Sequence, residues 1–421
     1  MVVYFLKIQY DVGIPFLSRM ICDLGHIKLC KRRRVDDNVR ILQLTDIHYF
    51  HSKCEIFETK GRKIDVNRER YSNETTPKFV RDMIQRSEPD LVVLTGDVID
   101  GRVFKDMPRD SWRDAFMDIV RPINELNVPW TFTPGNHDDD SSPWERQDLL
   151  GVYELEGCIS RGAKSFDHRM TVSFDTSNKG IILWFFDSGG NNIKHPELRY
   201  ETFKCVDAFR EQHQRQHKRS TDNKTCELAF FHIPLPQCNG LVPLKGRNGL
   251  FDSALNAQMV PFPWNFIPFV VRLLGKDRIV GSSKIESGMY DAMVSHGNIR
   301  ACFFGHDHFS DAVFVKNVAS DRSMYFAYGR VSGFTPPIDW EGDAGTIPFK
   351  RGGRVVEVKK NGNVSTWIHN ESGHEEKDTR LELPFSQPRK GVFTMTTYSI
   401  ATSILIAAAL SYSYKLLYSS S

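Results

Sequence analysis

Short apolar runs recur along residues 39–370 and alternate with segments of helical periodicity. Three early runs, VRILQLTD (39–46), DLVVLTGD (90–97) and PWTFTPGNHD (129–138), are rich in β-branched or aromatic residues and end in polar ones. Such runs are typical of buried strands, and the periodic segments between them are typical of helices that cover a sheet. The order strand, helix, strand predicts an α/β fold in which these strands pair in parallel.

Two apolar stripes at helical spacing separate the three early runs. The first begins after Thr76-Pro77, a good helix start, and stops before Pro89. The stripes consist of Phe79, Val80, Met83 and Ile84, and of Trp112, Phe116, Ile119 and Ile123. Later apolar runs at 180–187, 226–234 and 299–308 are expected to extend the sheets, and the runs at 323–329, 353–360 and 363–369 to close them.

Polar side chains follow the apolar runs, at the points where the predicted strands end. The carboxyl ends of parallel strands share one edge of a sheet, so these side chains are expected to converge. They are Asp46, His48, Asp97, Asn136, His137, His232, His306 and His308. In an extended segment the imidazoles of His306 and His308 would point to the same side. A lone H-x-H more often ends a strand in solvent, so the prediction of a metal site depends on the whole set.

The mixture of carboxylate, imidazole and amide groups indicates the kind of metal. It suits Fe, Zn or Mn better than Mg or Ca. Two transition-metal ions, each with about four protein ligands and one shared ligand, would account for all the predicted ligands. The sequence therefore predicts a binuclear metal site as the cofactor.

Charge and cysteine content narrow the function classes. The formal net charge is +3 over 421 residues, which lacks the basic footprint of a nucleic-acid-binding protein, so no nucleic-acid partner is expected. The eight cysteines include no C-x-x-C pair, so neither a zinc knuckle nor a dense disulfide framework is predicted.

Outside the domain predicted at 39–370, the ends of the chain differ in character. Residues 1–38 form a leader without a secretory signal, and residues 371–391 are charged and are expected to be a linker. Residues 392–410 carry no charge and are expected to form a C-terminal transmembrane helix, followed by a short tail at 411–421. The alternative for 392–410 is a buried terminal helix.

The charges beside the expected span predict its orientation. Arg389 and Lys390 precede it and only Lys415 follows it, so the catalytic domain is expected on the cytoplasmic side of a membrane whose organelle is not indicated. A second irregular segment, residues 240–277, is rich in aromatic residues and prolines. It is expected to be an insertion that packs on the core, with a lid or membrane-facing flap as the alternative.

Five sequence blocks carry a resemblance to a known family. In order they are DIH, GDVID, GNHD, the histidine of FFHIP, and GHDH. As a set they resemble the calcineurin-like metallophosphoesterase superfamily, and they are most similar to its purple-acid-phosphatase-like subgroup of short plant-type enzymes. The resemblance covers about residues 40–310 and implies a sandwich of two mixed β-sheets flanked by α-helices.

The resemblance also implies a role for each residue of the blocks. Asp97 would bridge the two metal ions, His137 would lie near the leaving oxygen as an acid or a charge stabiliser, and Asp138 would orient the His137 ring. The implied ligands are Asp46, His48, Asp97 and His308 for one ion, and Asp97, Asn136, His232 and His306 for the other.

Two positions depart from true purple acid phosphatases. His48 stands where those enzymes have Gly, and Asp100 stands where they have a tyrosine ligand. Without that tyrosine the protein is expected to be colourless, which counts against a pair that contains Fe(III) and leaves two divalent ions as the alternative.

The resemblance implies a phosphatase that hydrolyses phosphomonoesters, phosphoproteins among them, by direct attack of a metal-bridging hydroxide on phosphorus. With the span expected at 392–410, the enzyme is expected to be membrane-anchored. One alternative is a phosphodiesterase acting on nucleotides or lipid head groups, because the blocks hold metal and phosphate and not the rest of the substrate. Another is a non-catalytic binding protein of the same fold. The oligomeric state is not indicated.

Overall fold

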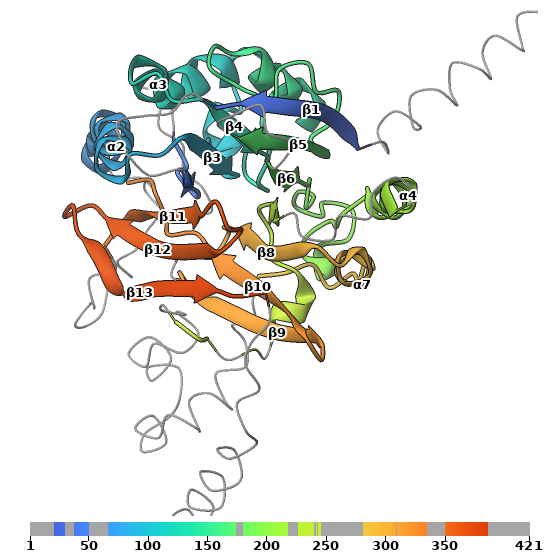
Figure 1. Ribbon diagram of the computed structural model, residues 1–421. Coiled ribbons are helices and arrows are strands. Elements are labelled where there is room, and N and C mark those ends of the chain that lie inside the picture. Colours follow the sequence, from blue (N-terminus) through green and yellow to red (C-terminus); the bar gives the residue numbers. More distant parts are fainter. Residues whose placement is uncertain are drawn as a thin grey trace, which may run out of the picture.

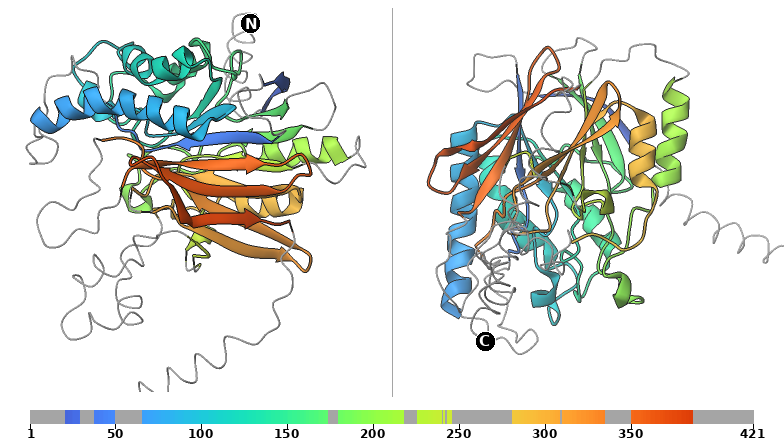
Figure 2. Two further views of the ribbon diagram at one scale, coloured as in Figure 1. Left: turned by 60° about the vertical axis from the view of Figure 1, so that its left-hand side comes forward. Right: turned by 90° about the horizontal axis from the view of Figure 1, so that it is seen from below.

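The computed structural model of the chain describes residues 21–29, 38–49, 66–173, 180–217, 226–239, 241, 243–245, 281–308, 310–334 and 350–385. Two mixed β-sheets lie face to face in this part of the chain, with helices on their outer sides (Figures 1 and 2). The predicted sandwich of two mixed β-sheets flanked by helices is therefore confirmed.

The seven-stranded sheet has the order β1-β5-β6-β7-β8-β10-β9. Its strands are β1 (Cys22–Lys28), β5 (His168–Ser173), β6 (Ile181–Phe185), β7 (Glu227–Phe230), β8 (Ile299–Phe304), β9 (Val313–Ala319) and β10 (Arg322–Tyr328). Strands β6, β7, β8 and β10 run parallel, and β9 returns antiparallel at the edge.

The six-stranded sheet has the order β13-β12-β11-β2-β3-β4. Its strands are β2 (Val39–Leu44), β3 (Leu91–Thr95), β4 (Trp130–Thr133), β11 (Gly352–Val358), β12 (Val364–Asn370) and β13 (Glu375–Leu383). The predicted parallel pairing of the three early strands is confirmed, because β2 pairs with β3 and β3 with β4 in parallel.

Helices cover both outer faces of the sandwich. They are α2 (Val66–Ser87), α3 (Trp112–Glu125), α4 (Val206–His217) and α7 (Met289–His296). Figure 2 shows α2 outside the six-stranded sheet, and α4 and α7 outside the seven-stranded sheet. Short 3₁₀ helices η1 (Gly101–Phe104), η2 (Arg146–Glu154), η3 (Pro196–Leu198) and η4 (Pro236–Cys238) lie in the connections.

Alternation along each strand divides the core into three layers. In β2, Leu42 and Leu44 face the helices α2 and α3, whereas Ile41 faces the other sheet. A third cluster lies between the seven-stranded sheet and the helices α4 and α7, and includes Phe209 and Met289. Both faces of the central strands are buried, which explains why their sequences are continuous apolar runs.

Helix α2 begins earlier than predicted. The apolar stripe from Phe79 to Ile84 is buried as expected, and the helix ends at Ser87, before Pro89. Its start, however, is Val66, so Pro77 lies inside the helix and removes one backbone hydrogen bond instead of starting it.

The predicted boundaries of the domain are too narrow at both ends. The expected leader, residues 1–38, contains β1, which pairs with β5. The expected linker, residues 371–391, contains β13, which pairs antiparallel with β12. Its many charged residues hide the strand, because an edge strand exposes one side to solvent. The insertion expected at 240–277 lies almost wholly outside the described residues.

The predicted C-terminal transmembrane helix is not supported. No helix within the described ranges is both long and apolar enough to cross a membrane. Residues 392–410 lie outside those ranges, and their six Ser and Thr side chains dilute the apolar character of the segment. Within the described residues, the fold class is therefore corrected to the two-sheet sandwich without a transmembrane helix, and no membrane partner is proposed.

Candidate metal centre

The loops that follow five strands meet at one end of the sandwich. Three belong to the six-stranded sheet, after β2, β3 and β4, and two to the seven-stranded sheet, after β7 and β8. Backbone hydrogen bonds join the loops, from the His48 N–H to the Asp97 carbonyl at 2.8 Å and from the Gly305 N–H to the His232 carbonyl at 3.1 Å. The His306 N–H donates to the Asp46 carboxylate at 3.0 Å and links the two sheets.

The backbone at this junction is strained. Asp46, His48, Asp97 and His306 have φ angles of 52°, 47°, 49° and 79°, a region that non-glycine residues seldom adopt. Strain of this kind persists only where the surrounding structure over-determines it, and it gathers at functional sites. The strain also explains why the i and i+2 rule for strands fails at His306 and His308, which follow the end of β8 and face different groups.

Two glycines allow the loops to approach one another. A side chain at Gly305 would meet the Thr45 hydroxyl and the Asp46 carboxylate, and its Cβ would lie 2.7 Å from Asp46 Oδ2. A Cβ at Gly135 would lie 2.2 Å from Asp97 Oδ1. Neither position has room for a side chain unless an acidic residue of the site moves.

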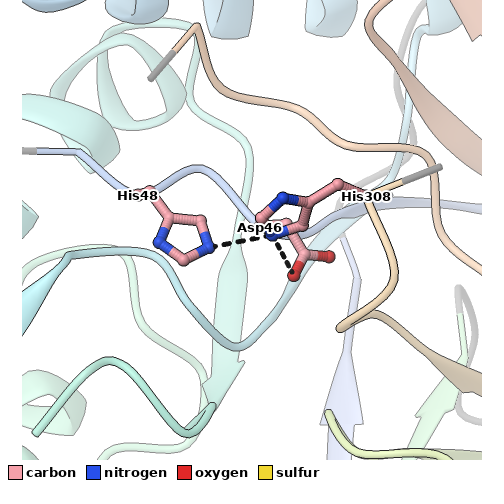
Figure 3. A group of neighbouring side chains, drawn as sticks. All are labelled: Asp46, His48 and His308. Atoms are coloured by element: carbon pink, nitrogen blue, oxygen red, sulfur yellow. Dashed lines mark hydrogen bonds and ion pairs between the residues drawn. The ribbon is translucent and has the colours of Figure 1, made fainter. Parts of the chain in front are cut away.

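The first group of candidate ligands consists of Asp46, His48 and His308 (Figure 3). One ligand atom of each lies within 4.8 Å of the others. His48 Nε2 is 3.1 Å from His308 Nε2, and His308 Nε2 is 3.6 Å from Asp46 Oδ1. Asp46 and His48 are buried, and His308 is partly exposed.

The second group consists of Asp97, His232 and His306, within the same 4.8 Å limit. Asn136 joins it, because its Oδ1 lies 3.2 Å from His232 Nε2. Asp97, Asn136 and His232 are at most 2% exposed. The structure thus brings together all seven predicted ligands in the two sets that the sequence blocks imply.

Asp97 lies between the two groups. Its Oδ2 is 3.1 Å from His232 Nε2 and 3.5 Å from His48 Nε2. Its other oxygen accepts the backbone N–H of His137 at 2.7 Å. One carboxylate oxygen therefore faces an imidazole from each group.

Two imidazoles are oriented through their Nδ1 atoms. His232 Nδ1 lies 2.8 Å from the Thr95 carbonyl, so Nδ1 carries the proton and Nε2 faces the group. His48 Nδ1 lies 3.5 Å from Asp100 Oδ2, and Arg102 holds that carboxylate through its Nε at 2.7 Å. Both arrangements match those of metal-binding histidines in proteins.

Burial and charge set the protonation of these groups. Burial, with the positive charge of His232 added, lowers the pKa of His306 to about 3, so its imidazole is neutral at pH 7. Burial alone would also lower the pKa of His232, but the Asp97 carboxylate raises it to about 9. Metal binding at Asp97 would therefore release a proton from His232.

The predicted role of Asp138 is wrong. Its carboxylate accepts four backbone N–H groups, from Asp97, Val98, Ile99 and Gly135, at 2.6–3.0 Å. It fastens the loop after β3 to the loop after β4. Asp140 orients that ring instead, with its Oδ2 3.0 Å from His137 Nδ1.

Sequence reasoning missed several residues around the groups. Asp140 stands in the acidic run HDDD, and Asp100 stands where true purple acid phosphatases have a tyrosine ligand. Both positions therefore gave only a weak sequence signal for a role in the site. Partly buried Arg146 offered none, although it binds Asp187 at 2.7 Å and the Gly135 carbonyl at 2.8 Å. Asn191 bonds to Asn136 at 3.2 Å and lies in no recognisable motif.

A cavity of about 1060 Å³ opens beside Asn136 and Asp140. It extends along η2 and the loop after β6 to helix α4. Its lining includes seven carboxyl side chains against three cationic ones. Two of those carboxyl groups, Asp139 and Asp187, are paired with Arg146.

Comparison with curated proteins gives distant relatives over most of the chain. The chain is 25% identical over 361 residues to "Probable inactive purple acid phosphatase 28" of Arabidopsis thaliana, which covers 80% of this chain and 79% of the relative. It is 23% identical over 347 residues to "Phosphatase DCR2" of Saccharomyces cerevisiae, and this alignment covers 78% of this chain and 53% of that protein.

Among solved structures, a dimetal phosphatase from Danio rerio aligns over 83% of this chain and 99% of its own, with 12% identity and a TM-score of 0.45. That likeness is too distant to carry weight for function. The family model described as calcineurin-like phosphoesterase matches residues 39–310, which hold every strand end of the site. The chain therefore belongs to the calcineurin-like phosphoesterase family.

Proposed function

We propose that this protein is a phosphatase that depends on two metal ions and hydrolyses phosphomonoesters. The observation that carries the proposal is the position of Asp97, whose Oδ2 faces His48 from one ligand group and His232 from the other. A single carboxylate between two groups of ligands is the arrangement that a pair of ions sharing one ligand requires.

The side chains present fit such a pair. Asp46, His48, His308 and Asp97 would hold one ion, and Asp97, Asn136, His232 and His306 the other. Four imidazoles with carboxylate and amide oxygens favour Fe, Zn or Mn over Mg or Ca. Asp100 belongs to neither ligand group and contacts the Nδ1 atom of His48. It therefore does not replace the tyrosine ligand of true purple acid phosphatases, which fits a pair of divalent ions.

Two metal ions, when bound, supply an activated water and neutralise charge on the phosphoryl oxygens. The residues of this chain then have to deliver a proton to the departing alcohol. His137 is suited to this role, because its ring is held by Asp140 and lies 5.3 Å from the His48 ring, measured between centroids. Its side chain is 22% exposed, so a substrate can reach it.

The cavity beside Asn136 and Asp140 gives room for the alcohol part of the ester. Its excess of carboxyl groups disfavours a leaving group with further negative charge, because like charges repel. A phosphomonoester of an uncharged or cationic alcohol, such as a phosphorylated side chain of a protein, fits this lining better than a nucleotide does.

The names of the relatives point in two directions. The Arabidopsis protein carries the description "probable inactive", and the yeast protein is described as a phosphatase. In this chain all seven ligand positions and His137 are present and converge. A non-catalytic member would be expected to have lost some of them, so the arrangement favours the enzyme.

The test is phosphate release by the metal-loaded protein from a panel that contains phosphomonoesters and phosphodiesters. We expect turnover of monoesters, and a fall of about 100-fold or more in kcat for His137→Ala with unchanged metal content. His374→Ala, at an exposed position in the β12–β13 turn and in neither ligand group, is the matched control and should keep full activity. A preference for diesters would overturn the proposed substrate class. No turnover of any ester would overturn the proposal that the protein is an enzyme.

A further inference from the structure

We infer that residues 187–200, the segment that follows β6, position the ligands of the second group and thereby set the affinity of one metal ion and not the other. The inference rests on the proposed two-metal function and concerns residues that the family blocks do not include. Three contacts from this segment reach the second group, and each arrives at a different ligand or its neighbour.

The first contact fixes the amide of Asn136. Asn136 Nδ2 donates to Asn191 Oδ1 at 3.2 Å, and Asn191 Nδ2 donates back to the Asn136 carbonyl at 3.2 Å. Because the Nδ2 atom of Asn136 is engaged with Asn191, its Oδ1 atom is directed toward His232 Nε2. The reverse orientation would present an NH₂ group, which cannot bind a cation.

The second contact fixes the ring of His306. The Tyr200 ring meets it edge to face, with centroids 4.6 Å apart and an interplanar angle of 90°. The centroid of the His306 ring also lies 5.2 Å from that of the His232 ring. The Tyr200 carbonyl accepts the Ser283 hydroxyl at 2.9 Å, so the backbone that carries the tyrosine is itself held.

The third contact lies next to His232. The buried Ser188 hydroxyl accepts the Ile233 N–H at 2.9 Å. Within the segment, Asn191 and Tyr200 form an antiparallel β-bridge, so the residues that touch Asn136 and His306 are also fixed to one another.

Arg146 joins the segment to the loop that carries Asn136. Its guanidinium binds Asp187 at 2.7 Å and the carbonyls of Gly189 and Gly135 at 3.2 and 2.8 Å. The first group is held from elsewhere, since Asp46 is bonded by Thr45 and the His306 N–H, and His48 faces Asp100. These first-group contacts come from residues outside 187–200, and the His306 N–H joins the two groups through Asp46.

Loss of an outer contact to a metal ligand typically weakens metal affinity by 10- to 100-fold. Asn191→Ala should therefore weaken the second ion by that factor and leave the first nearly unchanged. After dialysis against a limiting concentration of Mn²⁺, elemental analysis should give two ions per chain for the wild type and one for the variant. The electron paramagnetic resonance spectrum should change from that of a coupled pair to that of an isolated Mn²⁺.

The matched control is Asn192→Ala, one residue further along the same segment. The Asn192 side chain accepts the His195 N–H at 2.9 Å, so its loss should leave two ions bound. Tyr200→Ala and Tyr200→Phe provide a second test that does not depend on Asn191. The phenylalanine keeps the ring edge against His306 and should retain both ions, whereas the alanine should lose one.

The inference would be overturned if both Asn191→Ala and Tyr200→Ala bound two ions with wild-type affinity. It would also be overturned if these variants bound both ions equally more weakly. The proposed function fails in a different way, namely if the wild type itself binds no pair of ions. Circular dichroism and the thermal midpoint of each variant separate loss of metal from loss of fold.

Discussion

At the scale of single residues, the site combines strained backbone with acidic side chains that have different roles. Asp138 and Asp140 are neighbours in one run of three aspartates, yet the first is fully buried against backbone N–H groups and the second faces His137. The sequence identifies such a run but not which carboxyl group turns toward which partner. That choice depends on the loop after β3, which brings three N–H donors to Asp138, and on Gly135 in its own loop, which supplies a fourth.

The two aspartates should respond differently to the same substitution. Asp140→Asn should lower kcat by at least about tenfold with unchanged metal content and stability, because the amide no longer stabilises a protonated His137 ring. Asp138→Asn should instead lower the free energy of unfolding by about 1–3 kcal/mol, because an NH₂ group would then face backbone donors. Steady-state kinetics and chemical denaturation measure the two effects, and a reversed pattern would restore Asp138 as the partner of His137.

At the scale of elements, the apolar runs predicted the central strands well. Strands 39–44, 91–95 and 130–133 are buried on both faces. A continuous apolar run indicates this kind of burial. Strand β13, with sequence EEKDTRLEL, escaped detection because its charged residues lie at a sheet edge. Its partners are distant in sequence: Glu376 binds Arg330, a fully buried residue that also binds Asp311.

Glu376→Gln tests whether β13 is an integral strand. The change removes one carboxylate from buried Arg330 and should lower the free energy of unfolding by about 1–3 kcal/mol. Glu382→Gln, on the same strand, removes an exposed partner of Lys359 and should cost less than about 1 kcal/mol. Denaturant titrations of both variants provide the comparison, and equal costs would mean that the buried pair contributes nothing particular.

At the scale of the whole molecule, the site exists because two sheets meet. Asp46, Asp97 and Asn136 come from one sheet, and His232 and His308 come from the other. The sequence alone predicted this set through the blocks that resemble the family. It did not predict the supports, because residues such as Asn191 and Arg146 act through contacts that only the folded chain creates and that no local pattern marks.

Buried acids outside the two ligand groups give the stability of the molecule a pH dependence. Burial and the Asp187 carboxylate raise the pKa of Asp167 from 3.8 to about 7. The folded protein therefore binds this proton more tightly than the unfolded chain, and stability falls as the pH rises from about 4 to about 7. Each unit of difference is worth about 1.4 kcal/mol, so the loss is on the order of a few kcal/mol.

Asp167→Asn should remove this loss, because an amide oxygen can still accept the Asp187 N–H that Asp167 now accepts at 2.9 Å. The free energy of unfolding of the variant, relative to that of the wild type, should increase as the pH rises from 4 to 8. Unfolding experiments at each pH measure this difference. Asp207→Asn, whose side chain is 93% exposed, serves as the control and should follow the wild type. Parallel profiles for Asp167→Asn and the wild type would contradict the raised pKa.

The central claim is that Asp97 lies between two bound metal ions at the junction of the sheets. It is tested most directly by anomalous diffraction from crystals grown with Mn²⁺ or Zn²⁺. The structure predicts two peaks about 3.5–4 Å apart, one among Asp46, His48 and His308 and the other among Asn136, His232 and His306, with Asp97 touching both. A single peak, or none at saturating metal, would contradict the account.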